Sequence, residues 1–86
     1  MEENQHENAP AAAYYLHDLG VLLRERALAA KKAKVSAQSP SEREFEDGRL
    51  MAYYEVISLM QNQAIAFQLP FDAIGLEGID PDNDLT

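Results

Sequence analysis

Hydrophobic side chains recur with helical spacing along two stretches of the chain. In the first, apolar residues fall three or four positions apart from Ala12 through Leu23 to Ala33. This is the period of an amphipathic helix, and the strong helix formers alanine, leucine, lysine and arginine dominate residues 10–37. Pro10 suits a first helical position, because its missing N–H would be unpaired there in any case. The pattern predicts a helix over about residues 10–37.

A second helix is marked by the clearest local signal in the chain. Ser39 and Glu42 form a capping box, in which the serine side chain accepts a hydrogen bond at the start of a helix and the glutamate stands at the third position. Apolar residues then recur with helical spacing up to Phe67, and Pro70 cannot continue the helix. These features predict a helix over about residues 40–68.

The two predicted helices are joined by only a few residues, around positions 35–38. Short connections between helices favour antiparallel neighbours. An antiparallel arrangement also places the basic end of the first helix, at residues 31–34, beside the acidic start of the second, at residues 42–47. Both observations predict an all-α fold built on an antiparallel two-helix hairpin.

The two ends of the chain differ from its helical part. Residues 1–9 are polar and acidic, and we expect a disordered N-terminal tail there. A proline and a glycine outline a short helical turn over residues 70–75, which is apolar enough to fold back onto the open end of the hairpin. Residues 77–86 are predicted to form a solvated acidic C-terminal tail, so the single domain spans residues 10–76.

Two glycines, Gly20 and Gly48, fall inside the predicted helices, where each costs up to about 1 kcal/mol relative to alanine. Glycine is useful where a backbone must approach another closely, because it has no Cβ. We therefore interpret both positions as close helix crossings.

The second predicted helix carries apolar residues on more than one stripe. A helix with a single neighbour needs a narrower apolar face, so this width indicates at least two neighbours. The chain has 86 residues and no cysteine, so it has neither a large core nor disulfides, and pairing with a second copy is the expected source of stability. We predict a homodimer that forms a four-helix bundle, with a different protein partner as the rival. The predicted interface comprises Tyr15, Leu16, Leu19, Leu23, Tyr53, Val56, Ile57, Met60 and Phe67.

The net charge of −8 comes mainly from the two ends of the chain and the start of the second helix. The bases of the first helix are expected to lie beside acids of the second, which argues against a nucleic-acid partner. No apolar run approaches the ~20 residues that cross a bilayer, and the acidic start of the chain is unlike a secretory signal. We expect no membrane association and a cytoplasmic location.

Few residues offer chemistry. Glu55 lies in an apolar stretch, where a carboxyl group could carry a raised pKa or bind a metal, but a partly exposed glutamate paired with Arg24 or with a tyrosine hydroxyl is the simpler interpretation. His17 next to Asp18 could titrate near neutral pH or bind a metal, but a surface histidine is again simpler. Neither residue belongs to a Glu-x-x-His motif, which is the spacing found at metal sites in helical bundles. The sequence therefore predicts no catalytic, cofactor or metal site.

These observations predict a small non-enzymatic interaction or regulatory protein that acts as a homodimer. The alternative is an acidic protein that mimics nucleic acid and inhibits a DNA- or RNA-binding protein. The net charge favours that alternative, but the acidic residues do not form one continuous helical stripe. A small helical-bundle enzyme or metal-binding protein is a third class, and it rests on Glu55 and His17.

Overall fold

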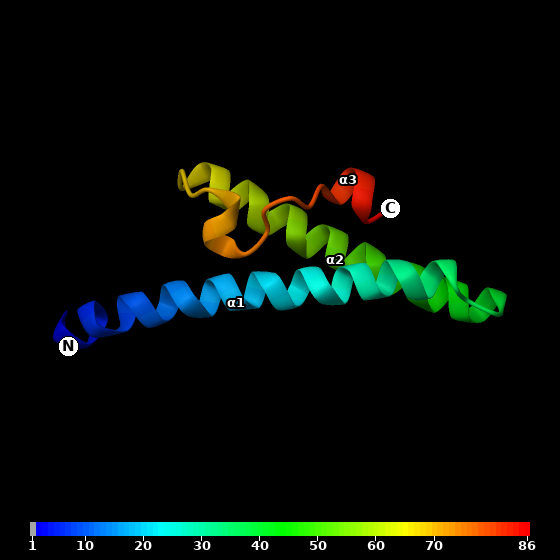
Figure 1. Ribbon diagram of the computed structural model, residues 1–86, viewed down its shortest axis with the longest axis horizontal. Helices are drawn as coiled ribbons and strands as arrows, with labels where there is room; N and C mark the ends of the chain where they lie inside the picture. Colours follow the sequence, from blue (N-terminus) through cyan, green and yellow to red (C-terminus); the bar gives the residue numbers. More distant parts are fainter. Residues whose placement is uncertain (1) are drawn as a thin grey trace.

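The computed structural model describes residues 2–86, with side chains from residue 8 onward. The chain forms two long helices, α1 (Glu2–Val35) and α2 (Pro40–Ala66), followed by a short 3₁₀ helix, η1 (Phe71–Ile74), and a single-turn helix, α3 (Pro81–Asp84). Figure 1 shows α1 and α2 packed together as a hairpin, with the chain after α2 folding back over it. The predicted all-α hairpin with a short C-terminal turn is confirmed.

The start of α2 and the turn residue before it follow from local chemistry. The Glu42 backbone N–H donates to the Ser39 hydroxyl at 3.2 Å, which confirms Ser39 as the N-cap of α2. The Glu42 carboxylate in turn accepts a hydrogen bond from the backbone N–H of Gln38 at 2.9 Å, one residue before the cap. These two bonds satisfy donors that a helix start and a tight turn would otherwise leave unpaired.

The first helix is longer than expected at its N-terminus. We predicted a start near Pro10, whereas α1 begins at Glu2 and Pro10 lies inside it. The predicted disorder of residues 1–9 falls largely on residues whose side chains lie outside the described part of the chain, and it stays a prediction.

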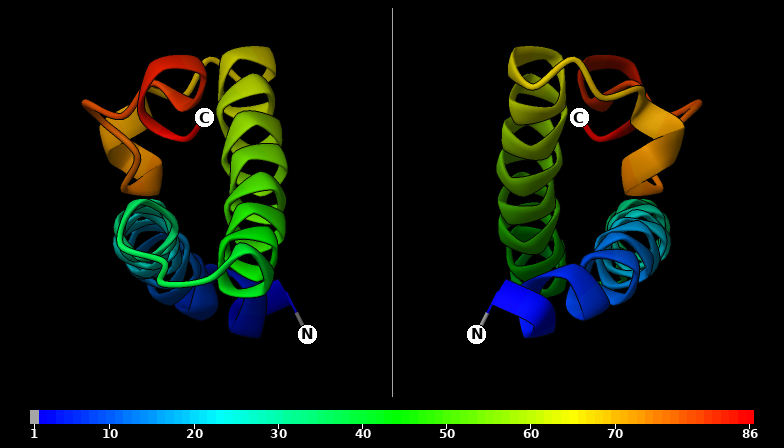
Figure 2. Two further views of the ribbon diagram at one scale, coloured as in Figure 1. Left: turned by 90° about the vertical axis from the view of Figure 1, so that its right-hand side faces the viewer. Right: turned by 90° about the vertical axis from the view of Figure 1, so that its left-hand side faces the viewer.

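The hairpin core is built from small residues on α1 and larger ones on α2. Ala27 and Ala30 are fully buried on α1, and they face a helix that contributes Leu50 and Ile57. Because alanine side chains are short, the two backbones can approach closely near the turn. Towards the other end the helices diverge, and Figure 2 shows the chain after α2 lying on α1 and beside α2.

The segment from Pro70 to the chain end, which we call the C-terminal segment, completes this core. Residues 77–86 were predicted to form a solvated tail, and this is wrong, because Ile79 and Leu85 are buried and Leu85 is only 1 % exposed. The acidic residues between them stay at the surface, and Asp80 caps α3 by accepting a hydrogen bond from the Asp82 backbone N–H at 3.1 Å. The apolar residues Ile79 and Leu85 thus allow this acidic segment to pack against the hairpin.

The two helical glycines have different environments. A Cβ atom built on Gly20 would lie 1.6 Å from the carbonyl oxygen of Ile74, so η1 and α1 touch through backbone atoms at this point. The expected close approach is therefore present at Gly20, but to the C-terminal segment rather than to a crossing helix. A Cβ on Gly48 would meet nothing within 4 Å, so the predicted crossing at Gly48 is wrong.

Gln61 is the buried polar residue that ties the C-terminal segment to α2. Its side-chain amide donates to the carbonyl of Ile79 at 2.9 Å and lies 3.4 Å from that of Leu76. Gln61→Leu keeps the approximate side-chain volume but leaves these carbonyls unpaired, so the free energy of unfolding should fall by about 1–3 kcal/mol. Urea denaturation followed by circular dichroism measures this loss.

The exposed neighbour Asn62 provides the control for this prediction. Asn62→Leu should change the free energy of unfolding by less than about 0.5 kcal/mol, because a surface substitution loses no buried hydrogen bond. Equal losses in the two variants would contradict the role assigned to Gln61.

Candidate interaction surface

The C-terminal segment covers one long face of the hairpin and leaves the opposite face open. On α1, Arg24 and Lys31 donate hydrogen bonds to main-chain carbonyls of the C-terminal segment, so they mark the covered flank of this helix. Successive residues of an α-helix advance by about 100°. Leu22 therefore points to the other flank of α1, and Tyr15, two turns earlier, shares that side.

The same geometry applies to α2. Tyr54 and Gln61 donate hydrogen bonds to the C-terminal segment and mark the covered flank. Val56 and Gln63 each lie two positions further on and point about 200° away. We call the uncovered side the open face and define it by its large apolar residues: Tyr15, Leu19, Leu22 and Leu23 of α1, and Phe45, Tyr53, Val56, Leu59, Met60 and Phe67 of α2.

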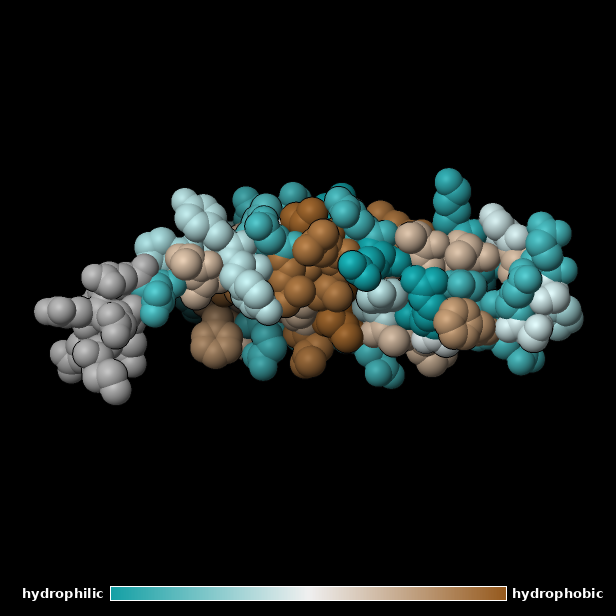
Figure 3. Space-filling model, turned by 90° about the horizontal axis from the view of Figure 1, so that it is seen from below, coloured by the Kyte–Doolittle hydropathy of each residue, from teal (hydrophilic) through white to brown (hydrophobic). Residues whose placement is uncertain are grey.

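Figure 3 views the molecule from the side opposite the C-terminal segment and shows a continuous hydrophobic patch across the middle of this face. Phe45 and Phe67 are 65 % and 73 % exposed, although phenylalanine is usually buried. Contiguous exposed apolar surface of this kind marks interaction sites in soluble proteins. The open face is therefore the candidate functional site.

Each end of the open face has a phenylalanine next to a hollow. Phe45 borders a hollow of about 520 Å³ near the hairpin turn, whose other walls combine Ala33 and Ala37 with the polar residues Ser36, Ser41, Glu42 and Glu46. Phe67 borders a smaller apolar hollow of about 170 Å³ at the other end, beside Leu16 and Met60. Both hollows are open to solvent and large enough to accept part of a side chain.

The residues predicted to form an interface divide into three groups. Tyr15, Val56 and Phe67 are exposed on the open face. Ile57 is fully buried in the hairpin core, so it packs within this chain and offers no surface to a partner. The remaining predicted residues are half-buried at the seam between the helices: Leu16, Leu19, Leu23, Tyr53 and Met60.

Sequence reasoning omitted Phe45 from this set. Phe45 lies eleven residues before Val56, and Phe67 lies eleven residues after it. Eleven residues are close to three helical turns, so the three side chains share one side of α2. This spacing was the available signal for Phe45.

Glu55 and His17 do not form a site together. Glu55 is exposed and lines a hollow with Met51 and Leu85 on the covered side of the molecule, away from His17. His17 is exposed, and its Nδ1 lies 3.7 Å from the carboxylate of Asp18. Within the described residues, no group of three or more histidine, cysteine, aspartate or glutamate side chains could hold a metal ion.

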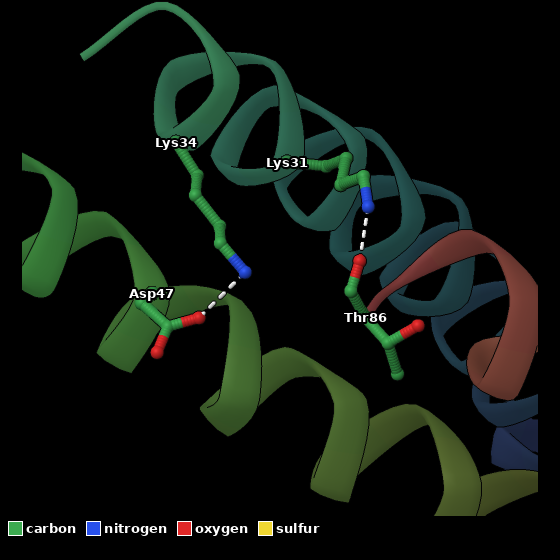
Figure 4. A network of polar contacts seen from close by, with 4 residues as sticks. All are labelled: Lys31, Lys34, Asp47 and Thr86. Atoms are coloured by element: carbon green, nitrogen blue, oxygen red, sulfur yellow. Dashed lines mark hydrogen bonds and ion pairs between the residues drawn. The ribbon is translucent and has the colours of Figure 1, made fainter.

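The basic residues of α1 are largely used within the chain. Lys34 and Asp47 form an ion pair of 2.8 Å, as expected from the charge pattern of the two helices, and Lys31 donates to the main chain of Thr86 (Figure 4). The hydrogen bond from Lys34 lowers the pKa of the Asp47 carboxyl group. Arg24, expected beside Glu55, instead donates to the carbonyl of Glu77 at 2.8 Å. Three of the five basic residues of this stretch, Arg24, Lys31 and Lys34, therefore make contacts within the chain.

No protein family, curated protein or solved structure matches this chain. Among residues 2–86, no helix combines the length and the apolar character needed to cross a membrane. The function is therefore inferred from the surface of this chain.

Proposed function

We propose that this protein is a non-enzymatic interaction protein that acts as a homodimer, in which the open faces of two hairpins pack into a four-helix bundle. The observation that carries the proposal is the exposed apolar surface along both helices on the side that the C-terminal segment leaves uncovered. Dimers with two-fold symmetry are the most common oligomers, and a second hairpin presents two helices to this two-helix surface.

The distribution of charge supports a second copy as the partner. The net charge of −8 would oppose self-association if the acids lay at the interface. The acids of the C-terminal segment, however, lie on the opposite side of the hairpin. On α2, Arg49 is neutralised within the chain by Glu46, whose carboxylate is 2.6 Å from the guanidinium group. Two open faces can therefore meet without burying an unpaired charge at this position.

The oligomeric state tests the proposal. Static light scattering across a dilution series should give the mass of a dimer for the native chain. Val56→Glu and Phe67→Glu each place a carboxylate in the interface, so we expect at least a 100-fold weaker dimer, which corresponds to about 3 kcal/mol.

Met51→Glu is the matched control, because Met51 is 59 % exposed on α2 but lies outside the open face. Its dimer affinity should stay within about three-fold of the native value. A native chain that is monomeric at all concentrations, or a Met51→Glu variant that dissociates as readily as Val56→Glu, would contradict the proposal.

A further inference from the structure

One row of α2 residues on the open face is symmetric about Val56: the intervals between successive members are the same towards the N-terminus as towards the C-terminus. The intervals along the row are four, three, four, four, three and four residues. We call this row the α2 seam; it consists of Phe45, Arg49, Ala52, Val56, Met60, Gln63 and Phe67.

The residue types of the α2 seam are matched about its centre at the two outer pairs of positions, and they differ in size at the innermost pair. The two outermost residues are both exposed phenylalanines, Phe45 and Phe67. One step further in, each side carries a long polar side chain, Arg49 or Gln63. Nearest the centre, a small alanine on one side corresponds to the long Met60 on the other. A row with this symmetry can pack on a copy of itself that runs in the opposite direction.

The geometry of an α-helix allows such packing along the full row. An eleven-residue interval gives about 3.67 residues per turn, close to the 3.6 of a straight helix, so the α2 seam drifts little around α2 over its length of about 33 Å. A two-fold axis through Val56 and perpendicular to α2 would therefore align all seven positions with those of a second copy.

Hollows lie at both ends of the α2 seam, where this arrangement needs them. In an antiparallel pair, Phe67 of one copy comes level with Phe45 of the other. Phe67 projects from the surface, and the hollow of about 520 Å³ lies beside Phe45. Conversely, Phe45 comes level with the apolar hollow of about 170 Å³ beside Phe67. Each protruding ring thus meets a depression on the second copy.

Charges on α1 agree with the same direction. Leu16 lines a hollow with Met60, and Lys34 pairs with Asp47, so Leu22 lies about level with Val56. Asp18 and Arg26 stand one turn before and one turn after Leu22. Arg26 makes no ion pair within residues 8–86. An antiparallel pair brings Asp18 level with Arg26 of the second copy, which has the opposite charge, whereas a parallel pair would bring Asp18 level with Asp18 of the second copy.

We propose that two copies dock antiparallel through the α2 seam, with each α2 crossing that of its partner at Val56. Phe67 of each copy inserts into the hollow beside the partner's Phe45. This inference rests on the proposed homodimer and specifies which residues of the two open faces meet.

Cysteine cross-linking tests this arrangement cleanly, because the native chain contains no cysteine. Val56→Cys places a thiol beside its own symmetry mate, so mild oxidation should yield a covalent dimer. Within a bound pair the effective thiol concentration is millimolar, so at micromolar protein this dimer should form at least about 100-fold faster than for Met51→Cys on the outer side of α2.

The direction of docking is tested with Arg49→Cys and Gln63→Cys, which lie seven residues on either side of Val56. The two variants are mixed, with one carrying a mass tag, and then oxidised. Antiparallel docking should give mainly the mixed disulfide between the two variants, whereas parallel docking would give each variant linked to itself.

The outcomes separate this inference from the proposed function. A dimer by light scattering in which Val56→Cys cross-links no faster than Met51→Cys would overturn the antiparallel seam and leave the homodimer intact. A predominance of Arg49→Cys or Gln63→Cys homodisulfides would overturn the direction of docking. A native chain that stays monomeric would remove both proposals.

Discussion

Replacing Gly20 by alanine should lower the free energy of unfolding by about 3 kcal/mol, although alanine is the better helix former by up to ~1 kcal/mol. The new methyl group would have to occupy a position 1.6 Å from the carbonyl oxygen of Ile74. The backbone that carries this oxygen cannot easily shift. The next residue, Gly75, has a left-handed φ of 72° and itself lies close to the backbone of α1. The C-terminal segment must therefore move away from α1, and its buried side chains lose their contacts. Chemical denaturation with circular dichroism measures the loss.

Gly48→Ala is the matched control, since Gly48 also lies inside a helix but faces open space. Here only the helix propensity acts, so the free energy of unfolding should rise by about 0.5–1 kcal/mol. The two glycine substitutions are thus expected to have opposite signs. A stabilised Gly20→Ala variant would show that η1 does not pack on α1 as described.

Leu85→Ala should destabilise the fold by about 2–4 kcal/mol, a large effect for a residue next to the chain end. Leu85 is 1 % exposed and belongs to the core with Leu50 and Ile57. Removing most of its side chain leaves a cavity beneath α3, whose single turn depends on tertiary contacts because so short a helix is unstable by itself. Thermal or urea unfolding measures the loss, and faster amide exchange within residues 76–86 would locate it.

Ile65→Ala serves as the comparison, because Ile65 is an aliphatic residue of α2 that is 63 % exposed. Its truncation should cost less than about 0.5–1 kcal/mol, since little apolar area leaves the core. If Leu85→Ala were no less stable than Ile65→Ala, residues 77–86 would not be packed on the hairpin, and the solvated tail predicted from the sequence would be correct.

The candidate site was predictable in part. Tyr15, Val56 and Phe67 could be placed on an outward apolar surface because helical periodicity assigns residues to faces without knowledge of the rest of the fold. Periodicity does not say which of several apolar stripes will be covered. Ile57 was therefore assigned to an interface although it is in the core, and Phe45 was left out although it is 65 % exposed.

Local patterns were sufficient to predict the two helices, the cap at Ser39 and the antiparallel hairpin, because these depend on interactions between residues a few positions apart. Three-dimensional packing was needed to place the C-terminal segment. Its acidic residues suggest a solvated tail, and the contacts that hold it down join it to α1 and α2 through Gly20, Gln61 and Leu85. The open face exists because that segment covers one side of the hairpin and not the other. Which side is covered depends on a close backbone approach at Gly20 and on the burial of apolar side chains that are far apart in the sequence. Patterns between residues a few positions apart contain no information on either contact.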